Sequence, residues 1–466
     1  MEDEFYFTNF VYKPDVYYFL YIGELKSYGL NPFLCDMFRR QLGREVEFIA
    51  IIPDVLIQYN YRNIIVIAPE MGAEDRQGRE QISFRAEIGQ FMRQVSAHPG
   101  IHRLIRQILS RQDHLYINMY ESDPNMTLDD LDRVSIIGPD KQLARKFNNK
   151  VVQLELLKDE IPVIDFQTCD SLAALLGATD RLWETWSDGI FVSRQYSAAG
   201  SGSRIARCRK DIEERFSDED APFLISRYIP HKLDPTVLAV TANEQDVYIA
   251  GVADQVIEDG NRFVGSTYPS VLPTDLIRKL REYTRRVGRI LARHGYRGIF
   301  GCDFLVDENR QIYFVEINAR KQGTTLEFCY TLEQLLPEGS ASLPELEYYA
   351  VEKGRFPENT REPNDIDLCP ICWGTYNYKL KDHQFTRGYI PQNPYERESF
   401  CKVASGDLIK DFVVLEHIGS RVLVFPGTFL ARIVSVGGKR ADVEEGLRQG
   451  REIIELTVEK KAVEQQ

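Results

Sequence analysis

The sequence predicts a mixed α/β protein in which an α/β part is followed by α+β parts. Buried apolar runs alternate with amphipathic helices up to about residue 130, and β-rich segments joined by short turns follow between residues 190 and 270. The 466 residues are enough for about three domains, at a prior of roughly 150 residues each. Apolar residues make up 43% and charged residues 27%, which is the balance of a folded globular protein.

The first segment alternates strands and helices. Three apolar runs are typical of buried parallel strands, namely Val46–Ile52, Asn63–Ala68 and Leu115–Met119. Between them, Arg79–Leu109 carries apolar residues at helical spacing, and we interpret its arginines as a solvated face. This alternation indicates a Rossmann-like α/β domain over residues 1–132.

A second domain is expected over residues 133–354. It opens with the apolar run Val134–Pro139, a helix from Lys141 to Asp159 and a strand that begins at Ile161. The later predicted elements are a strand–loop–strand unit over Ile190–Arg207, mostly antiparallel strands over Phe223–Ser266, a helix over Leu276–His294, and a strand pair over Ile299–Leu305 and Ile312–Ile317.

The last segment, residues 355–466, is expected to form a small α+β domain. Residues 355–367 are polar and hold two prolines, which is typical of a linker. Two strands are predicted over Arg421–Val436 and an amphipathic helix over Ala441–Thr457.

The eight cysteines predict reduced thiols, because only Cys369 and Cys372 lie close together in sequence. That pair has zinc-like spacing, and Cys401 and His383 are the nearby candidates for further ligands. Buried thiols are the alternative interpretation of the same residues.

The charge balance argues against nucleic acid as a partner. The chain has 57 Lys and Arg against 70 Asp and Glu, a formal net charge of −13, so there is no net cationic field to release phosphate counterions. A local basic site for a phosphate-bearing ligand is compatible with this balance. Residues Met1–Phe5 lack the basic character of a secretory leader, and no apolar run is long enough to span a bilayer. We therefore expect a cytoplasmic protein with no membrane partner.

Three oxygen-bearing side chains interrupt the last predicted strand pair. Side chains alternate along a strand, so Glu316 and Asn318 point to the same face, and a hairpin brings Asp303 opposite them. Carboxylates and an amide oxygen are the ligands that a hard cation such as Mg²⁺ prefers, with nucleotide phosphates and water completing its coordination. A polar hairpin with a solvated face would explain Glu316 alone.

This segment resembles the closing motif of the ATP-grasp superfamily, in which Asp is followed by Glu 13 positions later and by Asn two positions after that, as at Asp303, Glu316 and Asn318. The resemblance implies an ATP-grasp fold with a pre-ATP-grasp domain before it. It implies ATP as ligand and Mg²⁺, or Mn²⁺ in its place, bound by Glu316 and Asn318, with Asp303 holding a second metal. It also implies that Arg320 contacts the transferred phosphate and that Gly323–Thr325 lines the substrate carboxylate.

Weaker parts of the superfamily pattern occur in the expected order. Lys150 matches the first phosphate lysine, and its alternative interpretation is an exposed helix lysine. Arg194 stands where a second phosphate lysine is usual, and a guanidinium can bind phosphate oxygens bidentately without being equivalent to lysine. The flap that closes over the phosphates corresponds to Gly200, Ser201, Gly202 and Ser203.

The segment Phe223–Pro230 resembles the hinge that holds adenine. The resemblance places the backbone of Arg227, Tyr228 and Ile229 along the adenine edge, and Asp234 at the ribose hydroxyls. Ser226 stands where the family frequently has glutamate, so the side-chain contacts of the hinge are expected to differ.

The last domain, especially Gly419–Val434, resembles the small C-terminal domain of ATP-grasp peptide ligases of the pheganomycin presequence ligase type. This implies an amino acid, guanidino acid or peptide carboxylate joined to an amine, in a protein for which a homodimer would be ordinary. Glu327, Arg262 and Arg432 are candidate substrate-side charges, with structural ion pairs as the alternative. The segments Gly251–Gln255 and Gly265–Ser270 are candidates to face the acceptor, and packing is the equal alternative.

Function stays open between three classes. The first is an ATP-dependent carboxylate–amine ligase that forms an acyl phosphate. The second is another ATP-grasp enzyme, a phosphotransferase or a carboxylase, although no Met-Lys-Met biotinylation motif is present. The third is a catalytically silent ATP-binding regulatory protein, which Arg194 favours and the retained Asp303, Glu316 and Asn318 disfavour. A P-loop and a G-x-S-x-G hydrolase elbow are both missing from the sequence.

Overall fold

The computed structural model describes residues 5–56, 59–67, 82–83, 88–196, 202–217, 222–258, 260–363, 371–379, 384–386, 396–416, 422–424 and 429–463. The chain divides into two compact units. Unit 1 comprises Met1–Lys141, Thr325–Arg361 and Leu368–Gln466, and unit 2 comprises Gln142–Thr324 and Glu362–Asp367. The predicted domain limits at residues 132 and 354 stay predictions.

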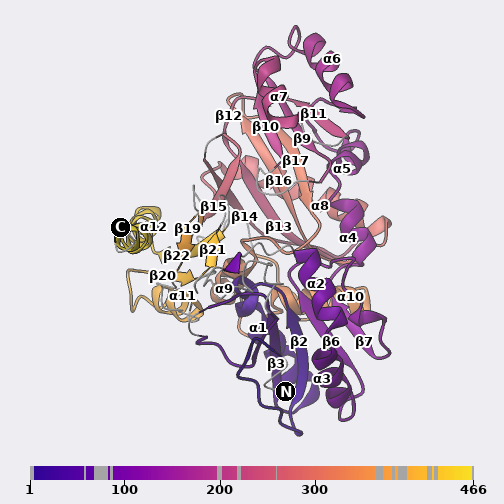
Figure 1. The fold of residues 1–466 in the computed structure, drawn as a ribbon, viewed down its shortest axis with the longest axis vertical. Coiled ribbons are helices and arrows are strands. Elements are labelled where there is room, and N and C mark those ends of the chain that lie inside the picture. Colours follow the sequence, from indigo (N-terminus) through magenta and orange to yellow (C-terminus); the bar gives the residue numbers. More distant parts are fainter. Residues whose placement is uncertain are drawn as a thin grey trace. The chain divides into compact units, whose positions relative to one another are not determined.

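The N-terminal part of unit 1 is a three-layer α/β domain (Figure 1). Its elements are β1 (Phe7–Thr8), β2 (Tyr17–Ile22), a 3-10 helix (Leu25–Leu30), α1 (Asn31–Leu42), β3 (Val46–Ile52), β4 (Ile64–Val66), α2 (Ile88–Ala97), α3 (Pro99–Leu109), β6 (Leu115–Met119), a 3-10 helix (Leu128–Asp130), β7 (Val134–Ile137) and α10 (Leu343–Lys353). The sheet order is β1-β4-β3-β2-β6-β7, and every pair except β1–β4 is parallel. Helices α2 and α3 cover one face, and α1 and α10 cover the other.

The sequence prediction for this domain is confirmed in its fold class and corrected in two places. Strand β2 at the sheet centre was missed. The helical stretch predicted over residues 79–109 is wrong in two respects. Ile82–Ser83 form the short strand β5, and the helical part is two helices, α2 and α3, because His98 is extended and Pro99 begins α3. A residue before proline is driven out of the helical region, which explains the break.

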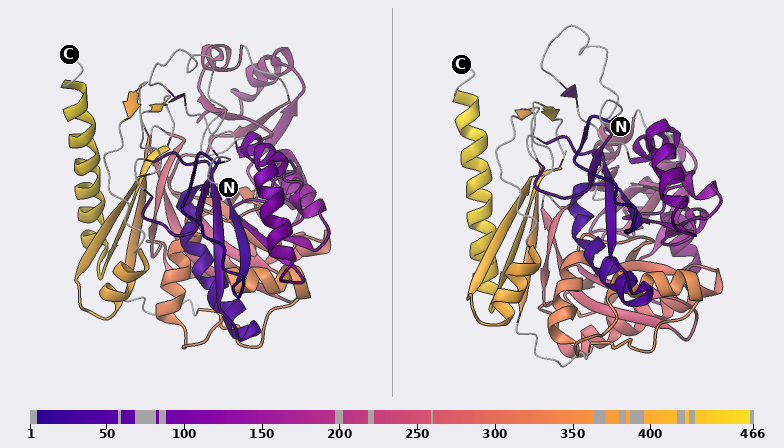
Figure 2. Two further views of the ribbon diagram at one scale, coloured as in Figure 1. Left: turned by 60° about the horizontal axis from the view of Figure 1, so that its bottom comes forward. Right: turned by 90° about the horizontal axis from the view of Figure 1, so that it is seen from below.

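The C-terminal part of unit 1 is α+β. It contains α9 (Thr325–Leu335), β18 (Cys372–Lys379), β19 (Gln384–Thr386), α11 (Glu396–Ala404), β20 (Lys410–Glu416), β21 (Val422–Val424), β22 (Phe429–Gly437) and α12 (Arg440–Val463), and β21 also pairs with β5 (Ile82–Ser83). Strands β18, β22 and β20 form an antiparallel sheet, and α12 runs along it (Figure 2). Gly446 and Gly450 permit this close approach, since a Cβ at Gly450 would lie 2.6 Å from the Ile433 side chain.

Unit 2 contains two antiparallel sheets. Its elements are α4 (Lys141–Phe147), α5 (Lys150–Leu157), β8 (Phe166–Cys169), α6 (Leu172–Leu182), β9 (Ile190–Arg194), β10 (Ser203–Ala206), α7 (Arg209–Phe216), β11 (Phe223–Arg227), β12 (His231–Leu233), β13 (Pro235–Thr241), β14 (Val247–Glu258), β15 (Arg262–Tyr268), α8 (Thr274–Arg293), β16 (Gly298–Asp307) and β17 (Ile312–Asn318). The smaller sheet has the order β10-β9-β11-β8, and the larger has β12-β16-β13-β14-β15 with β17 paired to β16.

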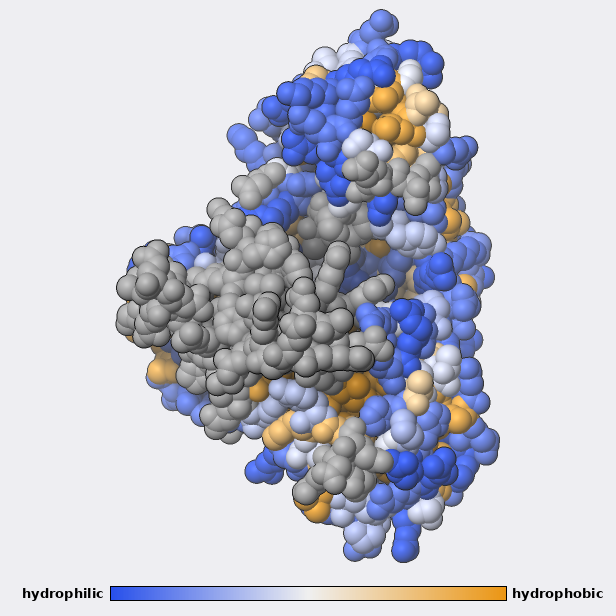
Figure 3. Space-filling model, in the orientation of Figure 1, coloured by the Kyte–Doolittle hydropathy of each residue, from blue (hydrophilic) through white to orange (hydrophobic). Residues whose placement is uncertain are grey.

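Each sheet of unit 2 has its own core. Helices α6 and α7 pack on the smaller sheet, and at this upper end of the view the surface is mostly hydrophilic with one hydrophobic patch (Figure 3). Helix α8 packs on β13 and β14 of the larger sheet, and residues of α4 and α5 join the same core. The strand pair predicted within residues 190–207, the antiparallel strands, the α8 helix and the final strand pair are confirmed, while residues 197–201 of the predicted loop lie outside the described residues.

The helix predicted from Lys141 to Asp159 is wrong in one respect, because it breaks into α4 and α5 at Asn148 and Asn149. The Asn149 side chain caps α5 by accepting hydrogen bonds from the amides of Val151 and Val152. The Asn148 side chain accepts one from the amide of Ala319 instead of continuing the helix. Asn competes for backbone groups in this way and favours caps over helix interiors. The break makes Lys150 the first residue of α5.

No helix in the part of the chain that the structure describes is both long and apolar enough to cross a membrane. The described cysteines are free thiols, in agreement with the sequence prediction, and Cys372 and Cys401 are among them. Cys369 and His383 lie outside the described residues, so the zinc alternative stays a prediction.

Candidate active site

The β16–β17 hairpin brings the three predicted metal ligands together. Asp303 and Glu316 are direct partners across the two strands, and Asn318 pairs with Gly301. The Asn318 amide Nδ2 donates a hydrogen bond of 2.8 Å to Asp303 Oδ2. The strands form here because buried apolar residues such as Cys302 and Ile317 alternate with the polar ones and anchor the hairpin in the core. The predicted convergence of these side chains is therefore present.

Two of the three oxygen donors, Glu316 and Asn318, each contact a cationic side chain. Lys150 Nζ forms an ion pair with Glu316 Oε2, and Arg320 Nη2 donates a 2.9 Å hydrogen bond to Asn318 Oδ1. The backbone of Lys150 is held in place by a hydrogen bond from its amide to the carbonyl of Gln195. Burial lowers the pKa of Lys150 to about 8, and Arg320 adds to this effect while Asp303 opposes it. Lys150 is therefore built into the site and is not an exposed helix lysine.

Two residues that sequence reasoning missed lie beneath Asp303. Thr236 Oγ1 donates a 2.7 Å hydrogen bond to Asp303 Oδ1, and Gln322 Nε2 donates one of 3.2 Å to the same oxygen. Both side chains are almost fully buried. The only signal for Thr236 is its register opposite Asp303, which needs the β13–β16 pairing to be known.

The predicted phosphate residues of the smaller sheet lie at the end of β9 and the start of β10. Arg194 is the last residue of β9, and its backbone amide donates to the carbonyl of Gly202. Gly202 has φ +70°, a conformation that glycine adopts without steric cost. Ser203 begins β10 and accepts hydrogen bonds from the Asn261 side chain. Gly200 and Ser201 lie outside the described residues.

The predicted hinge connects β11 to β12. The amide of Arg227 donates to the carbonyl of Asp165, and the amide of Tyr228 donates to that of Gly189. Ile229 packs in a small core with Ile164 and Leu305. The position between the two sheets fits a hinge, and adenine contact by its backbone stays a prediction.

Asp234, the predicted ribose ligand, pairs with His231, which the sequence analysis did not single out. Asp234 Oδ1 lies 2.8 Å from His231 Nε2. Burial alone would lower the pKa of His231, but the hydrogen bond and negative charge of Asp234, aided by the carbonyl of Ile229, raise it overall. The imidazole is therefore biased toward its charged form beside Asp234.

The candidate substrate-side charges form ion pairs within their own units. Glu327 and Arg432 make a buried ion pair in unit 1, between α9 and β22. Arg262 Nη2 lies 2.6 Å from Glu258 Oε2 in the β14–β15 hairpin of unit 2. Asp254 accepts hydrogen bonds from Ser270 Oγ and the amide of Val271, which favours the packing alternative for that segment.

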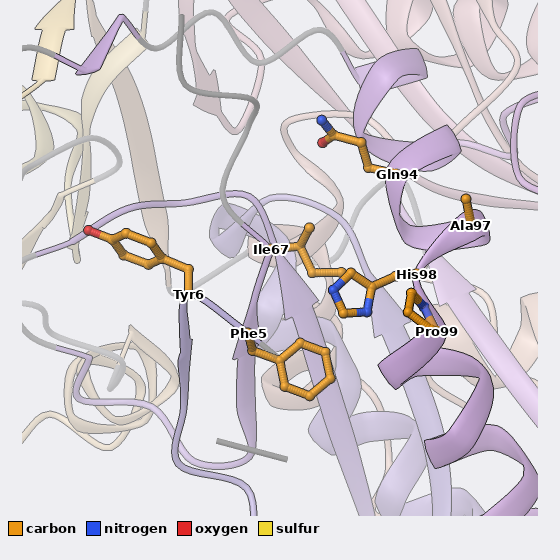
Figure 4. Close-up of a pocket in the computed structure, with 7 residues that line it drawn as sticks. All are labelled: Phe5, Tyr6, Ile67, Gln94, Ala97, His98 and Pro99. Atoms are coloured by element: carbon orange, nitrogen blue, oxygen red, sulfur yellow. The ribbon is translucent and has the colours of Figure 1, made fainter. Parts of the chain in front are cut away.

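Unit 1 also has a mostly apolar pocket of about 450 Å³. Figure 4 shows its lining, which comes from the N-terminal segment, the end of β4 and the junction of α2 and α3, namely Phe5, Tyr6, Ile67, Gln94, Ala97, His98 and Pro99. The ring of His98 stacks on Phe5 with centroids 5.1 Å apart, and burial lowers the pKa of His98. None of the predicted site residues lines this pocket.

The described side chains fit a divalent cation. Two carboxylates and an amide oxygen converge from adjacent strands, and Mg²⁺ and Mn²⁺ prefer such oxygen ligands. The Asn318 amide turns its nitrogen to Asp303 and its oxygen away from it. That oxygen is the atom that can bind a cation, so the donor set has the right chemistry.

Comparison with known proteins agrees with this geometry. The family described as "ATP-grasp domain" matches residues 185–324, which include β9, the hinge, Asp303, Glu316 and Asn318 but not Lys150. The match likens this part of unit 2 to an ATP-grasp domain. The predicted resemblance and fold class are thereby confirmed.

Two curated proteins that are similar to parts of this chain are ligases. The butirosin acyl-carrier protein–L-glutamate ligase of Niallia circulans is 25% identical over 211 residues, which cover 43% of this chain and 49% of that protein. The L-propargylglycine–L-glutamate ligase of Streptantibioticus cattleyicolor is 27% identical over 125 residues, which cover 27% of this chain and 25% of that protein. The matches thus span about half or less of the length of these relatives.

Solved structures share the fold of this chain over almost its whole length. The biotin carboxylase of Campylobacter jejuni, in complex with a β,γ-ATP compound, gives a TM-score of 0.60 at 14% identity and covers 91% of this chain and 88% of that chain. The carboxyaminoimidazole ribonucleotide synthase of Aspergillus clavatus, complexed with ATP, gives 0.56 at 16% identity and covers 96% of this chain and 100% of that chain. At these identities the likeness is one of fold.

Proposed function

We propose that this protein is an ATP-dependent ligase that activates a carboxylate as an acyl phosphate and joins it to an amine, releasing ADP and phosphate. One observation carries the proposal. Asp303, Glu316 and Asn318 converge within an ATP-grasp domain, with Lys150 and Arg320 directly beside them. The two ligase relatives support amide formation over the other ATP-grasp reactions.

In the first step, a carboxylate oxygen of the substrate attacks the γ-phosphorus of ATP, the bond to the β,γ-bridging oxygen breaks, and ADP leaves. Asp303, Glu316 and Asn318 would hold Mg²⁺, which when bound neutralises phosphate charge and aligns the reacting groups. Lys150 and Arg194 would bind phosphate oxygens, and Arg320 would contact the transferred phosphoryl group. The protein thus supplies position and charge, and no covalent nucleophile is needed.

In the second step, the amine attacks the carbonyl carbon of the acyl phosphate. The C–N bond forms, the C–O bond to phosphate breaks, and the nitrogen loses a proton. Because water would hydrolyse the acyl phosphate, the site must exclude it. The flap residues Gly202 and Ser203, at the entry to β10, are suited by position to this role.

The test is release of ADP and, separately, AMP by the purified full chain with ATP and Mg²⁺. L-Glutamate, other amino acids and short peptides are supplied as pools, since both ligase relatives are named for L-glutamate. Glu316→Gln is the inactive variant, and Glu308→Gln is its matched control because Glu308 lies on the exposed turn between β16 and β17.

We expect ADP release that depends on an acid and an amine, is lost in Glu316→Gln and is kept in Glu308→Gln. Release of AMP would contradict the acyl-phosphate route. Release of ADP that requires bicarbonate and no amine would favour a carboxylase instead.

A further inference from the structure

Beneath the candidate metal ligands lies a closed hydrogen-bond ring of Thr236, Gln322 and Asp303. Thr236 Oγ1 lies 2.7 Å from Asp303 Oδ1, and Gln322 Nε2 lies 2.9 Å from Thr236 Oγ1 and 3.2 Å from Asp303 Oδ1. A hydroxyl has one hydrogen to donate and an amide nitrogen has two. Thr236 therefore donates to Asp303, and Gln322 donates to both.

Gln322 can lie in this ring only because residue 301 is glycine. A Cβ on Gly301 would come within 2.0–2.4 Å of three atoms of the Gln322 amide group. Gly301 lies two residues before Asp303 in β16, so the amide rests against the strand that carries the carboxylate. Strand β13 pairs with β16 and places Thr236 directly opposite Asp303. Packing thus fixes both donors.

The ring determines which way the Asn318 amide points. With Oδ1 of Asp303 held by Thr236 and Gln322, its Oδ2 accepts from Asn318 Nδ2 at 2.8 Å. The Asn318 nitrogen is then turned to Asp303, and Oδ1 of Asn318 is turned to the side occupied by Arg320. An amide that rotated by half a turn would present hydrogens to a cation and repel it.

We propose that Thr236 and Gln322 are positioning residues that lock the Asp303 carboxylate and, through it, orient the Asn318 amide oxygen for a divalent cation. This inference rests on the proposed function and deepens it, because it names what keeps the metal-ligand set in order. Groups that orient metal ligands commonly contribute about 10- to 100-fold to metal affinity.

The test compares Mn²⁺ affinity in the presence of ADP, measured by electron paramagnetic resonance on the full chain, with ADP affinity measured in EDTA. Thr236→Val and Gln322→Met remove the donors at nearly constant volume. Gly301→Ala pushes Gln322 out of the ring. Thr236→Ser keeps the hydroxyl. Thr241→Val is the matched control, because Thr241 is a fully buried threonine of the same strand that bonds the carbonyl of Gly288.

We expect Mn²⁺ affinity to fall about 10-fold or more in Thr236→Val, Gln322→Met and Gly301→Ala, with ADP affinity in EDTA unchanged within about twofold. Thr236→Ser and Thr241→Val should bind Mn²⁺ like wild type. The double variant of Thr236 and Gln322 should lose less than the product of the two single losses, because both donors act on one oxygen.

Wild-type Mn²⁺ affinity in folded Thr236→Val and Gln322→Met would overturn the inference and leave the proposed function standing. Equal losses of Mn²⁺ affinity and metal-free ADP affinity would also overturn it, since they indicate a merely structural role. If the wild-type protein bound neither ADP nor Mn²⁺, both the proposed function and the inference would fall.

Discussion

At the scale of single residues, the ammonium group of Lys150 has one partner in the structure and a different partner in the proposed reaction. In the structure it neutralises Glu316, and in the proposed reaction it would bind a phosphate. The pKa of Lys150 is lowered because burial penalises the charged ammonium group, and the negative charge of Asp303 opposes this effect only in part. The sequence offered a surface lysine as the alternative, and the ion pair with Glu316 argues against it.

Replacing Lys150 by methionine should weaken ATP binding. A hydrogen bond to a charged group contributes about 1.5–3 kcal/mol, so we expect a loss of affinity of about 10-fold or more. Isothermal titration calorimetry with ATP in EDTA measures it without the metal. Lys158→Met is the control, because Lys158 is an exposed lysine at the other end of α5 and pairs with Glu155. Equal ATP affinities in wild type and Lys150→Met would show that Lys150 does not contribute to ATP binding.

At the scale of elements, the break between α4 and α5 decides where Lys150 lies. One continuous helix over residues 141–159, as the sequence suggested, would carry Lys150 in its interior with its amide bonded inside the helix. Instead Asn149 caps α5, and the amide of Lys150 bonds to Gln195 at the end of β9. The cap therefore couples the position of Lys150 to the strand that carries Arg194.

Asn149→Ala should destabilise the protein and also weaken ATP binding. Loss of an N-cap side chain costs about 1 kcal/mol of unfolding free energy, and here it also releases the first turn that carries Lys150. Ser171→Ala removes the matching cap of α6, where Ser171 Oγ accepts from the amide of Ala174. Urea unfolding should show similar losses for both variants, while calorimetry should show weaker ATP binding for Asn149→Ala alone. Weaker ATP binding in both Asn149→Ala and Ser171→Ala would show that a general loss of stability, and not the position of Lys150, is the cause.

The sequence predicted elements well where local pattern and packing agree. The convergence of Asp303, Glu316 and Asn318 could be predicted because strand alternation and hairpin pairing place them on one face. Thr236 and Gln322 were missed because their role depends on the register of β13 against β16 and on the small size of Gly301, which are properties of the folded sheet. The helical pattern over residues 141–159 does not reveal the α4–α5 break, because the capping preference of asparagine competes with a continuous apolar helix pattern.

At the scale of the whole molecule, every predicted ATP or metal residue that the structure describes lies in unit 2. Unit 1 holds a different charged feature. Arg432 of β22 pairs with Glu327 of α9, and Glu396 of α11 lies close enough to interact with both. After burial, the charge of Glu396 is the next cause that raises the pKa values of Tyr61 and Tyr330. This buried cluster ties together elements that are far apart in the sequence.

The cluster should make the stability of the protein depend on pH. Burial first, and the charge of Glu327 second, raise the pKa of Glu396 from 4.5 to about 8, while Arg432 opposes them. The folded state then keeps a proton that the unfolded chain releases near pH 4.5. The stabilisation is complete below about pH 4.5 and is lost as the pH rises to about 8.

Urea unfolding at pH 5, 6.5 and 8 measures this effect by comparison with Glu396→Gln, which cannot titrate. We expect the stability of the wild type relative to Glu396→Gln to fall steadily over this interval. Glu398→Gln, on the exposed side of the same helix, should keep the pH dependence of the wild type. Parallel curves for wild type and Glu396→Gln would show that Glu396 is ionised in the folded protein.

A newly synthesised chain can bury Glu316 without first capturing a metal ion, because Lys150 from α5 supplies the opposite charge. The same holds for Asn318, whose carbonyl oxygen is bonded by Arg320. The site can therefore form before nucleotide binds. In the proposed reaction, ATP binding would then be an exchange of partners, in which Lys150 and Arg320 pass from protein oxygens to phosphate oxygens. Removal of divalent cations with a chelator is expected to leave the protein folded.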